Sequence, residues 1–146
     1  MPTPPTKSPE EIRALMESAP QPVKNAATLL FLYACLSFLL VVITAILTKF
    51  WLILLTGLTA FLYPVLLSGR LYERKKWSYF VGVVGGFYYA LRLIWVLPHP
   101  PAKLMIPYGL YATNQCIGAV FGLLVAGTLL LPEARAYFFP AKQTPV

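Results

Sequence analysis

Four long apolar segments, separated by short connections, constrain this chain more than any other feature of its sequence. Each has about the 20 residues that an α-helix needs to cross the hydrocarbon core of a bilayer. Only 12% of the 146 residues are charged, whereas soluble domains carry about a quarter. The sequence therefore predicts an all-α integral membrane four-helix bundle. We place the membrane domain at residues 26–131, with spans at about 26–47, 51–68, 77–97 and 108–131.

Positive charge predicts the orientation of this bundle. Loops on the cytoplasmic side of membrane proteins carry an excess of Lys and Arg. Nine of the twelve Lys and Arg residues fall on one side of the four spans, Lys49 and Lys103 fall on the other, and Arg92 lies within the membrane. We therefore expect both termini in the cytoplasm. The densest cluster lies between the second and third spans, where we expect it to fix the topology and contact lipid headgroups. It consists of Arg70, Arg74, Lys75 and Lys76.

The two tails, residues 1–25 and 132–146, are then cytoplasmic. In the first tail, Ser8 precedes Pro9 and is followed three residues later by Glu11, which is the pattern of a capping box at a helix start. Ile12 and Met16 follow at helical spacing on one face. The pattern predicts a short amphipathic helix, which can remain solvated and partly frayed, dock on the bundle, or dock on a partner.

Two GxxxG motifs predict close packing of helices. Gly82 and Gly86 lie in the third span, and Gly118 and Gly122 lie in the fourth. Small residues at this spacing let two helix backbones approach closely in a membrane. The motifs can serve the protein's own bundle, self-association or contact with a foreign helix.

Arg92 is the most informative single residue, because an ionisable side chain inside a span is costly and usually functional. The chain has no Asp, and its five Glu residues all lie in segments predicted to be cytoplasmic. Arg92 can therefore reach lipid phosphates, enter a polar pocket, or meet a carboxylate of a partner or solute. The expected contact residues are Arg92, Tyr88, Tyr89, Asn114 and Gln115.

Other functional groups are sparse. Cys35 and Cys116 are far apart in sequence, and His99 is the only histidine, so no metal, cofactor or catalytic site is expected. A proton-coupled multidrug transporter would need a carboxylate in a span, and the four predicted spans contain no Asp or Glu, so this class of protein is not expected. The net charge of +7 is spread over the tails and one loop, as membrane topology alone produces, so nucleic-acid binding is not expected. We expect a protein that is not an enzyme.

The chain resembles small, poorly characterised bacterial inner-membrane proteins with four helices. The resemblance is carried by Gly69-Arg70 and Lys76-Trp77 around the central loop, and by Leu131-Pro132-Glu133-Ala134-Arg135-Ala136-Tyr137-Phe138 after the last span. The loop between the two pairs is longer here than is usual in that group. The resemblance implies a multi-pass protein of the bacterial inner membrane and no defined activity.

Three functional hypotheses follow. The first is a protein that acts through helix–helix contacts with another membrane component, as an accessory subunit or as an immunity protein against a membrane-inserting toxin. The second is a small carrier or channel with a polar site around Arg92. The third is a holin-like protein that forms membrane lesions. The expected partners are the lipid bilayer and another membrane protein, or a second copy of the chain.

Overall fold

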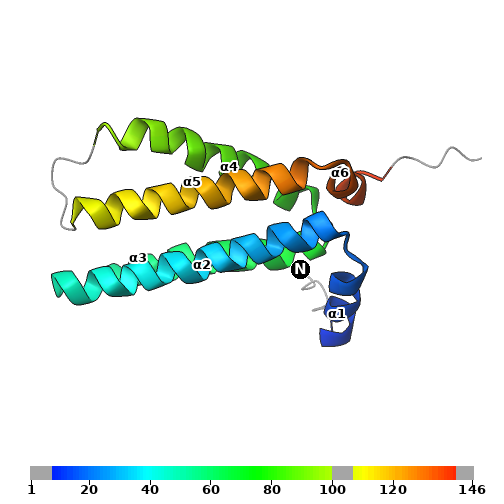
Figure 1. Ribbon diagram of the computed structural model, residues 1–146. Helices are drawn as coiled ribbons and strands as arrows, with labels where there is room; N and C mark the ends of the chain where they lie inside the picture. Colours follow the sequence, from blue (N-terminus) through cyan, green and yellow to red (C-terminus); the bar gives the residue numbers. More distant parts are fainter. Residues whose placement is uncertain (1–7, 100–106, 141–146) are drawn as a thin grey trace, which may run out of the picture.

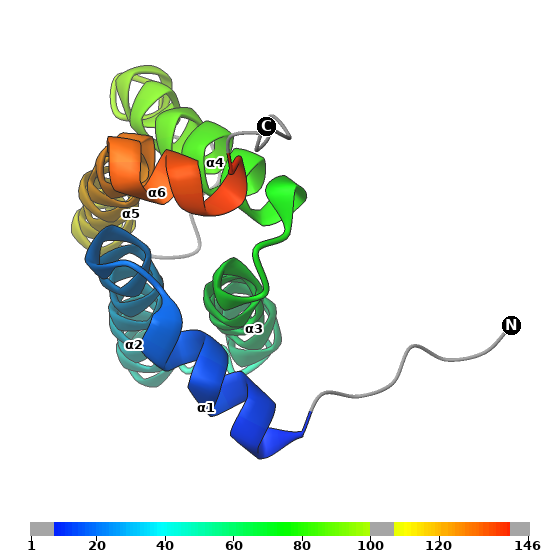
Figure 2. The ribbon, with the colours of Figure 1, turned by 90° about the vertical axis from the view of Figure 1, so that its right-hand side faces the viewer.

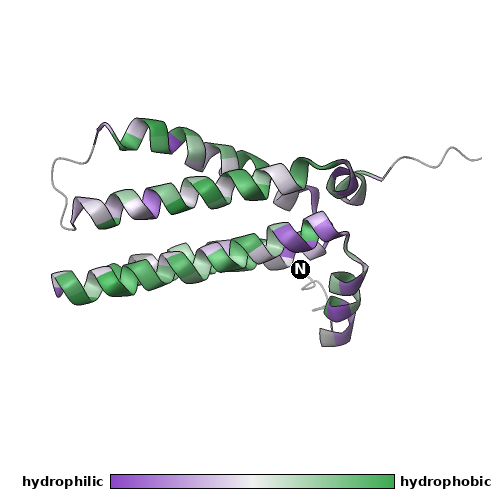
Figure 3. Ribbon diagram, viewed as in Figure 1, coloured by the Kyte–Doolittle hydropathy of each residue, from purple (hydrophilic) through white to green (hydrophobic). Residues whose placement is uncertain are grey.

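The computed structural model describes residues 8–99 and 107–140, and every regular element in them is a helix (Figure 1). The elements are α1 (Pro9–Ser18), α2 (Gln21–Thr48), α3 (Ile53–Tyr72), α4 (Lys76–Val96), α5 (Tyr108–Leu130) and α6 (Pro132–Phe138). Four of them, α2 to α5, are long and apolar enough to cross a membrane. Figure 3 shows hydrophobic residues along these four helices and hydrophilic residues gathered on α1 and the start of α2. The predicted all-helical fold with four spans is confirmed at this level.

The helix starts follow local sequence signals. The Ser8 hydroxyl accepts a hydrogen bond from the Glu11 backbone amide at 3.2 Å, and the Glu11 carboxylate accepts one from the Ser8 amide at 2.9 Å. The capping box thus begins α1 as predicted. Pro20 then holds an extended conformation between α1 and α2. Helix α2 begins at Gln21, five residues before the expected span, because Pro22 is well suited to the first turn of a helix.

The four long helices are packed in the spatial order α3, α2, α5, α4. Helix α2 lies along α3, α5 lies along α2, and α4 lies along α5, whereas α3 and α4 contact each other only sparsely. Viewed along the helices, α3 and α4 stand on either side of a gap between ribbons (Figure 2). The set of helices is therefore open along one side.

Both ends of the chain's described part lie at one end of the long helices, together with the connection between α3 and α4 (Figure 1). We call this the α6 end. The opposite end carries the α2–α3 connection, where Lys49 adopts a positive φ of 55° and terminates α2. This arrangement agrees with the prediction that the two termini lie on the same side of the membrane. That this side is the cytoplasmic one stays a prediction. Three of the charged residues counted above lie outside the described residues: Lys7, Lys103 and Lys142.

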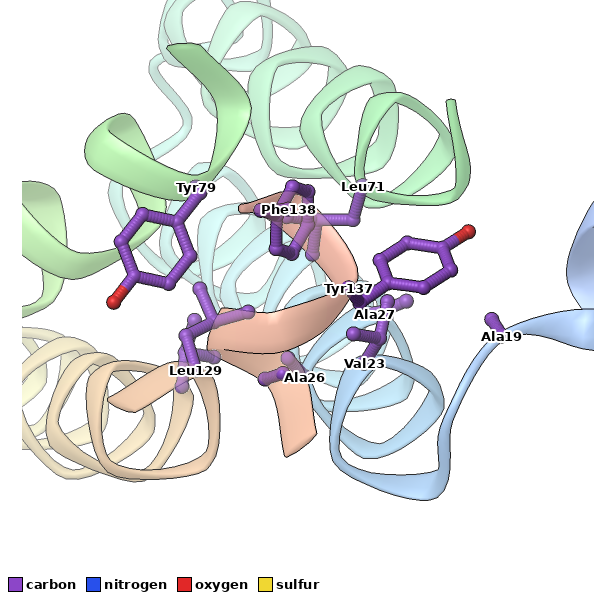
Figure 4. Close-up of a cluster of buried hydrophobic side chains, with 11 residues drawn as sticks. Ala19, Val23, Ala26, Ala27, Leu71, Tyr79, Leu129, Tyr137 and Phe138 are labelled. Atoms are coloured by element: carbon purple, nitrogen blue, oxygen red, sulfur yellow. The ribbon is translucent and has the colours of Figure 1, made fainter. Parts of the chain in front are cut away.

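A compact hydrophobic core lies at the α6 end (Figure 4). Phe138 is 2% exposed, and Leu71 and Leu129 are fully buried. Small residues of α2 and the α1–α2 connection let α6 approach. The core consists of Ala19, Val23, Ala26, Ala27, Leu71, Tyr79, Val125, Leu129, Ala134, Tyr137 and Phe138.

Helix α6 was not expected from the sequence, which predicted only that Pro132 stops or redirects the fourth span. Leu131 is extended, with ψ 144°, and Pro132 starts a new helix across the end of the long ones. Aromatic residues that follow a span commonly lie at the membrane interface, but Tyr137 and Phe138 are buried in the core. The Tyr137 hydroxyl donates a hydrogen bond to the Tyr72 carbonyl at 3.0 Å, which ties α6 to the end of α3.

Candidate functional site

The four glycines of the GxxxG motifs lie where α4 packs on α5. A Cβ atom built on Gly82 would lie 2.6 Å from Leu129 Cδ1, and one built on Gly86 would overlap the carbonyl oxygen of Gly122. A Cβ on Gly122 would lie 2.9 Å from the Gly86 carbonyl oxygen, and one on Gly118 would lie 3.3 Å from the Tyr89 ring. The two helices therefore approach almost backbone to backbone. These glycines are occupied by contacts within the chain.

Gly85 differs from its neighbour Gly86, because no atom lies within 4 Å of the position of its Cβ. It lines a mostly apolar groove of about 250 Å³ between α3 and α4, with walls completed by α2 and α5. The lining residues are Leu30, Tyr33, Tyr63, Pro64, Leu67, Val81, Gly82, Gly85, Gly86, Tyr88, Tyr89, Gly118, Phe121, Gly122 and Val125. The groove is the candidate site, since it occupies the open side of the helix set.

Tyrosine hydroxyls form a polar layer within this groove. Tyr33 of α2 and Tyr63 of α3 both lie close enough to Tyr89 of α4 for their hydroxyls to interact electrostatically. The rings of Tyr33 and Tyr89 are 6.0 Å apart in an edge-to-face arrangement, which is favourable for aromatic pairs. Residues from three helices thus place polar groups at one depth in an otherwise apolar groove.

A buried hydrogen bond extends the polar layer to α5. The Ser37 hydroxyl, which lies near Tyr33, donates to Asn114 Oδ1 at 3.2 Å. Ser37 is 3% exposed. Asn114 was expected near Arg92, and its oxygen is instead satisfied by α2. Gln115 is half-buried, and within the described residues it forms no hydrogen bond.

Arg92 is half-buried and lies near the polar layer, close enough for its charge to act on the Tyr33 hydroxyl. In the described part of the chain, Arg92 makes no hydrogen bond and no ion pair. Both salt bridges recorded there involve Glu73, at the α6 end. Of the predicted contact residues, Tyr88 and Tyr89 line the groove, whereas Arg92, Asn114 and Gln115 do not.

Sequence reasoning missed Tyr33, Ser37 and Tyr63. Tyr33 and Ser37 are four residues apart on the first span, so they share one helix face. Polar residues at that spacing in an apolar span were an available signal. Tyr63 carried no such signal, because nothing in its own span distinguishes it from an interfacial tyrosine.

The basic cluster at the α6 end is engaged within the chain. Arg70 and Lys75 form salt bridges with Glu73 at 2.9 and 2.8 Å. Arg74 stacks on the Tyr137 ring at 4.4 Å, and Lys76 lies 5.4 Å from the centre of the Phe139 ring. Arg74 has a positive φ of 56° in the tight connection between α3 and α4. The cluster thus helps to hold α6 and this connection, besides its predicted contact with lipid headgroups.

Glu73 is the one acidic residue in this cluster. Hydrogen bonding by Lys75, and then by Arg70, lowers the pKa of Glu73 below its ordinary value. The Glu73 carboxylate therefore stays charged to a lower pH than an ordinary carboxylate does, and both salt bridges depend on that charge. Glu73 thus has a structural role in the connection between α3 and α4.

Groups that commonly carry chemistry are not brought together. Among the described residues, no three His, Cys, Asp or Glu residues lie together in a way that could hold a metal ion. Cys35 and Cys116 are both exposed on their helices. His99 stacks on Trp95 with ring centres 5.0 Å apart, directly after the end of α4.

Comparison of the chain with protein-family models, with curated proteins and with solved structures finds no match. The resemblance to small bacterial inner-membrane proteins therefore stays a prediction from the sequence.

Proposed function

We propose that the protein is a non-enzymatic component of a membrane that works through helix–helix contact with another membrane protein, as an accessory subunit or an immunity protein. The open side between α3 and α4 is the observation that carries this proposal. Helix association in lipid depends on close van der Waals packing and on hydrogen bonds between helices. A groove with an open glycine, tyrosine hydroxyls and a nearby arginine offers both kinds of contact.

The surface proposed for the partner does not rest on the GxxxG contact between α4 and α5. Gly86 and Gly122 fill the contact between α4 and α5, so a foreign helix would have to separate these two helices to use them. Gly85 can be approached without such a rearrangement. The proposal therefore places the partner at the side between α3 and α4.

A second candidate function is a small carrier or channel, which the polar layer of Tyr33, Tyr63 and Tyr89 favours. The groove volume of about 250 Å³ is below the range of about 300–1,000 Å³ that is usual for pockets of small organic ligands. The carrier hypothesis predicts saturable uptake of a small anionic or aromatic solute into proteoliposomes, and loss of that uptake in Arg92→Leu.

Affinity purification of the tagged protein from its native membrane, in a mild detergent, tests the contact function. The expected result is one membrane protein recovered in stoichiometric amount, whose loss reproduces the phenotype of deleting this chain if the chain is an accessory subunit, or suppresses that phenotype if the chain is an immunity protein. Recovery of the protein alone, as a homogeneous oligomer, would contradict the proposal, and flux measurements would then decide on the carrier.

A further inference from the structure

Arg92 lies on the same face of α4 as residues that line the groove between α3 and α4. Val81, Gly85 and Tyr88 line the groove, and Arg92, which is not itself a lining residue, follows them at the next helical spacing. Arg92 lies four residues before Val96, the last residue of α4, which places it about 6 Å below the end of that helix. One face of α4 thus carries the apolar groove with its open glycine and, beyond it, one cation near the end of the helix.

No carboxylate of the chain can meet Arg92 at this depth. The five acidic residues are all Glu, and none of them lies in α2, α3, α4 or α5. They are found in α1, in α6 and directly after α3. A second copy of the chain in the same orientation would also carry them at the α6 end, so it cannot supply an acidic partner for Arg92.

We propose that the groove between α3 and α4 binds a transmembrane helix of another protein, and that this helix carries one Asp or Glu at the depth of Arg92. The inference rests on the proposed contact function and names its site and the chemistry of its partner. A guanidinium pairs with a carboxylate through two parallel hydrogen bonds. Gly85 lets the backbone of the incoming helix approach, and the tyrosine hydroxyls offer further hydrogen bonds to it.

A partner helix accounts for the groove better than a phospholipid does. If a lipid phosphate bound Arg92, a flexible acyl chain of that lipid would occupy the groove. An acyl chain gains nothing from the close approach to the α4 backbone that Gly85 allows. A helix uses that approach, since small residues are the usual contact points between helices in lipid. Phospholipid binding is therefore the competing outcome that the experiment must distinguish.

Site-specific photocrosslinking in native cells tests the location. Tyr88 lines the groove and is 59% exposed, while the adjacent Phe87 is 45% exposed, lies outside the groove lining and is rotated by about 100° around α4. Each is replaced in turn by p-benzoyl-phenylalanine, which extends either aromatic side chain by the same group and so keeps the pair matched. Position 88 is expected to crosslink to the membrane protein that co-purifies with the chain, and position 87 is not.

A synthetic peptide tests the charge. A transmembrane peptide of Leu and Ala carries one Glu about four residues from the end that lies on the same side of the membrane as the end of α4. It is compared with the same peptide carrying Gln at that position. Association with the purified protein in phosphatidylcholine vesicles is followed by energy transfer from tryptophan to a dansyl group on the peptide. The Glu peptide is expected to bind at least about tenfold more tightly, as a charge-assisted hydrogen bond allows. Arg92→Gln should remove the difference, and Lys76→Gln, at the other end of α4, should keep it.

The outcomes separate this inference from the function on which it rests. If no membrane protein co-purifies with the wild-type chain, the contact function fails. If one does co-purify but crosslinks from position 87 and not from 88, the function stands and the groove is the wrong site. Crosslinks from position 88 to phospholipid alone, or equal binding of the Glu and Gln peptides, would overturn the acidic helix.

Discussion

Gly85 and Gly86 are adjacent on α4, but substitution by Ala is expected to have opposite effects on stability at the two positions. In Gly86→Ala, the new Cβ would overlap the carbonyl oxygen of Gly122 and lie 2.9 Å from Ala126 Cβ. Ordinary contacts of a Cβ lie at 3.4–4 Å, so α4 and α5 must separate by at least about 0.5 Å, as expected for an overpacked interior. In Gly85→Ala, no atom lies within 4 Å of the new methyl group.

The expected free energies follow from this geometry. Overpacking typically costs about 1–3 kcal/mol, and the upper part of this range applies to Gly86→Ala because backbone atoms cannot move aside as a flexible side chain does. Gly85→Ala should be neutral or stabilising by up to about 1 kcal/mol, the difference in helix propensity between the two residues. The two variants should therefore differ by at least about 2 kcal/mol.

Unfolding by titration with SDS from dodecyl maltoside micelles measures the difference, with the fluorescence of the three tryptophans as the signal. Wild type, Gly85→Ala and Gly86→Ala are compared under the same conditions. Equal midpoints for the two variants would refute the assigned packing of α4 on α5, and so would a larger loss for Gly85→Ala.

Three further predictions use the same titration. Phe138→Ala should cost about 3–5 kcal/mol as a buried aromatic truncation, whereas Phe139→Ala, at a residue that is 38% exposed, should cost less than half as much. Ser37→Ala should cost about 0.6 kcal/mol and at most about 1.7 kcal/mol, the range for hydrogen bonds between membrane helices, and a double-mutant cycle with Asn114→Ala should assign that loss to the pair. Because the pKa of Glu73 is lowered in the folded protein, its charge stabilises the fold at a pH above the ordinary carboxyl pKa, and this stability is lost as the pH falls through the lowered pKa. If wild type and Glu73→Gln showed the same dependence of stability on pH, the role of this residue would be contradicted.

Much of the fold could be predicted because its signals are local. Apolar runs of sufficient length defined α2 to α5, and the capping box of Ser8 and Glu11 defined α1. Helix α6 could not be predicted in this way. Its burial depends on Leu71 and Tyr79, which are distant in sequence and belong to the core that Phe138 enters.

The candidate site was predicted only in part. Arg92, Tyr88 and Tyr89 lie on one helix, so their spacing alone indicated a common region. Tyr33 and Tyr63 join them because α2 and α3 pack in a particular rotation and register, which hydropathy does not encode. The open side between α3 and α4 likewise depends on which pairs of helices pack, and a count of four spans does not determine that.

If a membrane partner occupies the groove between α3 and α4, a side chain that fills this groove should exclude the partner. Gly85→Leu places a large side chain in the groove, while Gly127→Leu places the same side chain at another open glycine, on α5 and outside the groove lining. Affinity purification should therefore recover the partner with wild type and Gly127→Leu, and lose it with Gly85→Leu. Equal recovery of the partner with both variants would contradict this placement of the partner.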